Sequence, residues 1–161
     1  MHYNTEKNDH NLPHDPFKAL VSPRPIGWIG TKNNEGTNNL APYSYFNAIS
    51  DKPYFIMFAS TGFKDSIKNI EETKVFTCSL ATEKLFNKMN YSSASTQYGQ
   101  DEFELSGLVP KDGQFVNAPY VGESPAALEC ELWKVIDLPG SDRSNLSGSY
   151  VVFGHVKGIY I

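Results

Sequence analysis

The side chains of this 161-residue chain that could bind or activate a small molecule fall into three clusters. The first is SPRPIGWIGT, residues 22–31, where two prolines favour extended backbone on both sides of Arg24. Gly27 and Gly30 remove side chains directly after it and leave room for another group to lie against the backbone. The residue types alone favour a simpler interpretation, a strand that begins after a proline turn and presents a surface arginine.

The second cluster is NNLAPYSYFNAIS, residues 38–50. It places Asn39, Ser44 and Asn47 among tyrosine and phenylalanine side chains. Such a stretch can offer backbone N–H groups and short polar side chains to a flat aromatic ligand with polar edges. A strand with two mixed faces explains the same pattern equally well.

The third cluster is STGFKDSIKNI, residues 60–70, where hydroxyl groups and a lysine surround the expected start of a helix. These residues are Ser60, Thr61, Lys64 and Ser66. Free N–H groups and the helix dipole favour an anion there, and a lysine with hydroxyls would hold a phosphate. The alternative is an ordinary helix cap made by Asp65, with the lysine in solvent.

The three clusters together favour flavin mononucleotide (FMN) as the ligand. A phosphate needs an anion site, a ribityl chain needs small polar groups, and a flavin ring needs an apolar slot. Donors near N1 and O2 of the ring stabilise the negative charge that builds up on reduction. The usual nucleotide-binding motifs, G-x-G-x-x-G after a strand and the Walker loop, are absent from the sequence.

The elements that would position these clusters are mainly strands. Alternating or continuous apolar patterns predict strands at 25–32, 53–60, 75–81, 127–138 and 148–161, and 32–39 predicts a hairpin turn into the extended stretch 40–49. Helices are expected at 64–73 and 83–90, with a helical fragment near 101–107. The irregular excursion 91–125 is long enough to suggest a lid, a partner contact or disorder. The pattern predicts an all-β barrel with helical decorations and no internal domain boundary.

Composition narrows the class of protein. The net charge of −4 gives no general attraction to nucleic acid, and no apolar run is long enough to cross a membrane. Residues 1–16 are polar, so we expect a flexible lead rather than a secretory signal. Cys78 and Cys130 lie in apolar patterns, which favours buried free thiols in a cytoplasmic protein. The four histidines lack metal-ligand spacing.

Several stretches, in one order, resemble the flavin reductase-like family of FMN-binding split-barrel proteins, which includes flavoredoxin. They are LVSPRPIGWIGT, NLAPYSYFNAIS, KPYFIMFAS, KDSIKNIEET, DEFELSGL, ESPAALECEL and VVFGHV. The resemblance implies a mainly β, Greek-key split β-barrel with a few short helices over residues 17–161, forming a homodimer with FMN near the interface. Family members usually continue past the position of Ile161 with a segment resembling RLGGxxY, which this chain lacks.

Carried onto this sequence, the resemblance implies thirteen flavin contacts. They are Arg24, Pro25, Thr31, Asn39, Leu40, Ala41, Pro42, Tyr43, Ser44, Ser60, Lys64, Asp65 and Ser66. Ser66 stands where the family commonly has threonine, which keeps the hydroxyl. Trp28 and Asn47 are further candidates, and His155 is expected to be a core or edge histidine.

The expected function is an NAD(P)H-dependent FMN reductase, in which hydride passes from the nicotinamide C4 to flavin N5. The flavin supplies the chemistry, so no protein acid or base is expected. The electron acceptor would be a flavin-dependent monooxygenase or another acceptor. One alternative is a non-enzymatic, flavoredoxin-like electron-transfer protein, and another is an interaction protein that has lost its ligand.

Overall fold

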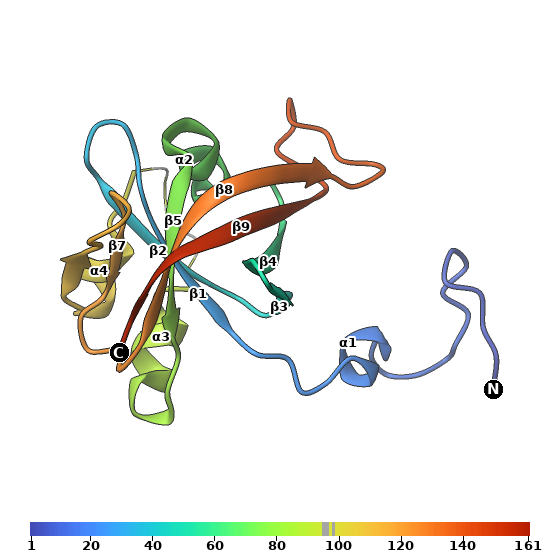
Figure 1. Ribbon diagram of the computed structural model, residues 1–161. Coiled ribbons are helices and arrows are strands. Elements are labelled where there is room, and N and C mark those ends of the chain that lie inside the picture. The colour runs from blue at the N-terminus through green and yellow to red at the C-terminus, as the bar shows by residue number, and fades with distance from the viewer. Residues whose placement is uncertain (95–96, 98) are drawn as a thin grey trace.

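A seven-stranded antiparallel sheet, ordered β2-β1-β5-β8-β9-β4-β3, forms the body of the protein (Figure 1). The computed structural model describes residues 1–94, 97 and 99–161. The strands of the sheet are β1 Gly27–Lys32, β2 Asn38–Tyr43, β3 Phe46–Asp51, β4 Tyr54–Thr61, β5 Val75–Leu80, β8 Ala127–Asp137 and β9 Ser149–Tyr160. The expectation of a mainly β split barrel with few helices is confirmed.

The sheet curls so that one face of each strand fills a common core. Along β4, buried Ile56 and Phe58 alternate with partly exposed neighbours, which is the period of a strand with one buried face. Phe76, Tyr150 and Val152 meet them from other strands. The connection between β2 and β3 runs beside β4, where the Ala59 N–H donates to the Tyr45 carbonyl at 2.8 Å.

Short helices, apart from α1, and a small two-stranded ribbon cover the outside of the barrel (Figure 1). The helices are α1 Phe17–Leu20, α2 Asp65–Thr73, the 3-10 turn η1 Glu83–Leu85, α3 Phe86–Tyr91 and α4 Glu102–Ser106. The ribbon pairs β6 Pro110–Asp112 with β7 Pro119–Val121. A second apolar cluster joins this cover to the sheet, with Trp28 and Leu40 packed against Phe103, Leu108 and Val121.

The apolar patterns predicted the elements well. The expected strands, the helix at 64–73 and the hairpin after residue 32 are present, and 83–90 divides into η1 and α3. The excursion 91–125 contains α4, β6 and β7, and its residues 95, 96 and 98 lie outside the described residues. Residues 1–16 contain no helix or strand, and Figure 1 shows them standing away from the sheet.

Neither a membrane-spanning helix nor a metal-binding group of side chains is found in the described part of the chain. No helix in it is long and apolar enough to cross a membrane. No group of three or more histidine, cysteine or acidic side chains among these residues is placed to hold a metal ion. Cys78 and Cys130 are buried free thiols, as expected, and burial raises the pKa of the Cys78 thiol to about 12.

The space beside Gly27 and Gly30 is filled by the protein itself. The Phe46 ring lies against Gly27, and the Pro119 carbonyl lies against Gly30. The expectation that these glycines admit a ligand is therefore wrong. They allow β3 and β7 to approach β1, because a Cβ at either position would overlap those neighbours.

Gly30→Ala should destabilise the fold by about 1–3 kcal/mol, since the obstacle to a Cβ is backbone that cannot rotate away. Gly27→Ala is the comparison, because there the obstacle is the Phe46 side chain. Urea unfolding of both variants measures the free energy of unfolding. Equal stability of Gly30→Ala and the parent protein would contradict this account of the glycine.

Candidate functional site

A cleft of about 480 Å³ lies between β2, β4 and the start of α2. Its volume falls within the range of small-molecule sites, about 300–1,000 Å³. The lining residues are Lys18, Asn39, Ala41, Pro42, Tyr43, Ser44, Tyr45, Ala59, Thr61, Phe63, Lys64, Asp65, Ser66, Ser92, Ser93, Ala94 and Glu102. The second and third clusters of the sequence therefore meet at one site.

The start of α2 at this cleft is free of side-chain caps. Lys64 is the N-cap residue in extended conformation, and it makes no side-chain cap hydrogen bond within the described part of the chain. Asp65 is the first helical residue, and its carboxylate instead accepts a 3.4 Å hydrogen bond from the Gly99 N–H. The alternative of an ordinary cap by Asp65 is thus wrong. An uncapped N-terminus beside a lysine is suited to an anion.

The Tyr43 hydroxyl is a buried polar group in the same cleft. Only 6% of Tyr43 is exposed, and its hydroxyl has no hydrogen-bond partner among the described residues. Burial raises the pKa of this phenol, and the nearby Ser66 and Ser60 hydroxyls offset part of the rise without a bond of good geometry. Tyr43 therefore keeps its proton at neutral pH and can donate a hydrogen bond to a ligand.

A buried network centred on Asn39 fixes the wall of the cleft. The Asn39 amide donates to Glu102 at 2.7 Å, and its oxygen accepts from Ser66 at 2.9 Å and from Thr31 at 3.1 Å. Asn69 donates to the Thr31 hydroxyl at 3.1 Å. All five side chains are buried. The network ties β1, β2, α2 and α4 together, so Asn39 lines the cleft with an amide whose bonds are already committed.

Eight of the thirteen expected contacts line the cleft: Asn39, Ala41, Pro42, Tyr43, Ser44, Lys64, Asp65 and Ser66. Three others are buried elsewhere. Thr31 lies behind Asn39, Leu40 packs in the second apolar cluster, and the Ser60 hydroxyl donates to the Gly62 carbonyl at 2.9 Å. Arg24 and Pro25 are outside the lining residues.

Arg24 clamps the N-terminal segment at the end of the cleft near Ser44. Its guanidinium donates to the Lys18 carbonyl and, at 2.8 Å, to the Val21 carbonyl. Its Nε donates to the Ser44 hydroxyl at 3.4 Å, and its guanidinium carbon lies 6.0 Å from the centre of the Tyr45 ring. The side chain thus connects α1 to two residues of the cleft.

Several lining residues were missed from the sequence. Phe63 and Ala59 are apolar, and Glu102 stands in an acidic stretch that does not suggest an anion site. Lys18 belongs to the short α1. Ser92, Ser93 and Ala94 begin the irregular excursion, where a lid or partner contact was the expectation.

The weaker candidates lie away from the lining. Trp28 is fully buried, and its indole N–H donates to the Ser92 hydroxyl at 2.9 Å, so it supports the cleft from behind. The exposed Asn47 side chain accepts from the Ala48 N–H at 2.9 Å. His155 stacks on Phe55 with ring centres 4.9 Å apart.

Asn39→Ala should lower the free energy of unfolding by about 3 kcal/mol. The change removes one hydrogen bond from each of the buried side chains of Glu102, Thr31 and Ser66, and losing a partner in the protein interior costs about 1–3 kcal/mol. Asn47→Ala, an exposed asparagine with only a local bond, should stay within about 0.5 kcal/mol. Urea unfolding measures both, and equal effects would contradict the central position of Asn39.

Curated proteins of other organisms are similar in sequence to this chain over most of its length. A protein of Aquifex aeolicus described as uncharacterised is 33% identical over 84% of the chain, and one of Deinococcus radiodurans is 35% identical over 89%. The chain spans 72% and 63% of their respective lengths.

Solved structures share the fold along the whole chain. Nitrilotriacetate monooxygenase component B from Bacillus cereus aligns with a TM-score of 0.88 and 26% identity, covering 100% of this chain and 81% of that protein. Pseudomonas fluorescens 2-nitrobenzoate 2-nitroreductase aligns with a TM-score of 0.86 and 27% identity, covering 100% and 76%. Both neighbours carry the names of redox proteins. Residues 20–160 match the family described as "Flavin reductase like domain", so the chain belongs to that family.

Proposed function

We propose that the chain binds FMN in this cleft and passes hydride or electrons from NAD(P)H to the flavin. One observation carries the proposal: the cleft ends on the start of α2, which has no side-chain cap, beside a buried Tyr43 hydroxyl that has no partner among residues 1–94, 97 and 99–161. A phosphate accepts hydrogen bonds and carries charge, so it would satisfy both features at once. The family match and the redox names of the structural neighbours support the same assignment.

The residues present fit the phosphate end of FMN. Lys64 would pair with the phosphate, and the backbone N–H groups of Asp65 and Ser66 would donate to it. Asp65 would contribute its backbone alone, because its carboxylate is negative. The Tyr43 hydroxyl would donate from the buried side.

The other end of the cleft fits a ring. Ala41, Pro42 and Ala59 present small apolar surfaces that exclude water, and Ser44 adds a hydroxyl. Arg24, fixed to Ser44, would bring positive potential toward this end. When bound, FMN supplies the redox chemistry, so the chain need only bind, orient and shield it. Thr31, Leu40, Ser60 and Pro25 would then act through the shape of the site rather than by contact.

A second copy of the chain is proposed to cover the outer face of β4, β8 and β9. Trp133 is 64% exposed, and its ring lies 5.8 Å from both Phe55 and Phe153 in edge-to-face contacts. Phe55 lies on the same alternating face of β4 as Ala59, which lines the cleft. A homodimer through this face would place the two copies beside the flavin site. Monomeric proteins rarely expose large apolar patches of this kind.

The electron acceptor is proposed to be a flavin-dependent monooxygenase, since two structural neighbours are named as components of nitrilotriacetate monooxygenase. Use of NAD(P)H as donor fits a cytoplasmic location. Neither assignment requires nucleic acid or a membrane.

FMN titration of the purified protein, followed by addition of NADH or NADPH, tests the main proposal. Binding with flavin bleaching by either nucleotide is the expected result. Binding with bleaching by dithionite alone would favour the electron-transfer alternative, and absence of FMN binding would overturn the proposal.

Lys64→Ala should weaken FMN binding by at least tenfold, because a charge-assisted phosphate contact contributes about 1.5–3 kcal/mol. Riboflavin, which lacks the phosphate, should bind both proteins equally. Lys52→Ala, on an exposed residue of the turn after β3, is the matched control. Equal FMN affinity in all three proteins would contradict the proposal that the phosphate lies at the start of α2.

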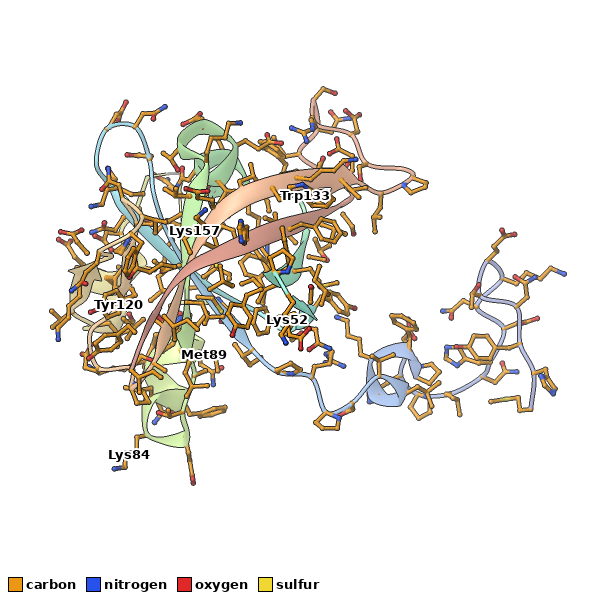
Figure 2. The ribbon with its side chains drawn as sticks, viewed as in Figure 1. Lys52, Lys84, Met89, Tyr120, Trp133 and Lys157 are labelled. Carbon is orange, nitrogen blue, oxygen red and sulfur yellow. The ribbon has the colours of Figure 1, made fainter. Side chains whose placement is uncertain are left out.

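Trp133→Glu should convert the dimer to a monomer, because it places a charge in the proposed apolar interface. Lys84→Glu is the control, and Figure 2 shows it at the opposite end of the molecule from Trp133. Light scattering after gel filtration measures the mass of each. A monomeric parent protein, or a dimeric Trp133→Glu variant, would exclude this interface.

A further inference from the structure

The loop between β8 and β9, residues 138–148, is tied to α2 by one arginine. Both terminal nitrogens of Arg143 donate to Glu71 in α2, at 2.7 and 2.9 Å. The same guanidinium donates twice to Asp137 at the end of β8, each time at 2.6 Å. Two paired bonds of this kind define the position of a guanidinium far better than a single ion pair does.

The same guanidinium lies over two aromatic rings. Its central carbon is 5.0 Å from the centre of the Phe63 ring and 5.5 Å from that of Tyr150. Phe63 and Tyr150 meet edge to face with ring centres 5.3 Å apart. Tyr150 is fully buried in the barrel, whereas Phe63 lines the cleft. Arg143 thus holds a cleft residue against the core by cation–π contact.

The backbone of the loop holds the segment that leads into α2. The Phe63 N–H donates to the Leu146 carbonyl at 2.9 Å, and the Gly62 N–H donates to the Gly148 carbonyl at 2.8 Å. Leu146 has a φ of 55°, an unfavourable backbone for leucine that places its carbonyl toward Phe63. The next residue after Phe63 is Lys64, the N-cap of α2. Any movement of the loop would therefore move the start of the helix.

We propose that Arg143 is a positioning residue for the flavin site, acting through Phe63 and the 62–64 backbone on the phosphate end of the cleft. This inference rests on the proposed function. Its ion pairs are partly exposed, with side-chain exposures of 42% for Arg143 and 26% for Glu71. Such pairs contribute little to the stability of a fold. Their effect is expected in the geometry of the 62–64 segment instead.

Arg143→Met keeps an unbranched apolar stem and removes the charge. It should weaken FMN binding about tenfold, with faster release, because the loop no longer holds Phe63 and Lys64 in place. In flavin-free protein, the Gly62 and Phe63 amides should exchange with solvent faster, since their carbonyl partners lie in the released loop. Glu71→Gln should show a smaller change in the same direction.

A double-mutant cycle separates this role from general stability. If Glu71 acts through Arg143, Glu71→Gln should add little to the effect of Arg143→Met on FMN affinity. The matched control is the surface pair of Lys32 with Asp112, 2.9 Å apart on β1 and β6. Lys32→Met and Asp112→Asn should leave FMN affinity and the two amides unchanged.

The outcomes are distinct from those that test the function. If the parent protein does not bind FMN, the proposed function fails. If it binds FMN while Arg143→Met changes neither the affinity nor the Gly62 and Phe63 exchange, the positioning role is overturned. An equal loss of affinity in the Lys32 control pair would also overturn it.

Discussion

The buried amide of Asn39 is the interaction on which the cleft depends. It joins β2 to α2 through Ser66, to α4 through Glu102, and to β1 through Thr31. No other side-chain chemistry would serve as well, because a primary amide donates to a carboxylate and accepts from hydroxyls at the same time. These three hydrogen bonds hold β1, β2, α2 and α4 in one fixed arrangement.

Two polar features of the cleft are left unsatisfied by the described part of the chain. Within it, the N-cap of α2 has no side-chain hydrogen bond, and the buried Tyr43 hydroxyl has no partner. Unpartnered groups of this kind cost free energy, and folded proteins usually satisfy them. The presence of these two features at the same cleft is the physical reason to expect an anionic ligand there. The cost of leaving them open would be recovered when the ligand binds.

Because neighbouring residues of a strand face opposite ways, one strand can contribute both to the core and to the outer surface of the barrel. Along β4, Ile56 and Phe58 fill the core, whereas Phe55 and Ala59 face outward toward the proposed partner copy and the cleft. The loop after β8 adds a further layer, because Arg143 connects the core ring of Tyr150 to the cleft ring of Phe63. Core, cleft and surface are therefore mechanically connected through a few side chains.

The sequence was sufficient for the strands, the helix at 65–73, the family and eight of the residues that line the candidate cleft, because these follow from local periodicity and from motifs in a known order. Leu40 could also have been separated from Asn39 and Ala41 by alternation, since neighbouring strand residues face opposite ways. The neighbours of Gly27 and Gly30, the clamp made by Arg24 and the contacts of Arg143 could not be read from it. Each joins residues whose proximity depends on how the barrel closes and how its loops return. Local sequence patterns do not show which distant residues come into contact, because long-range packing in the folded chain decides those contacts.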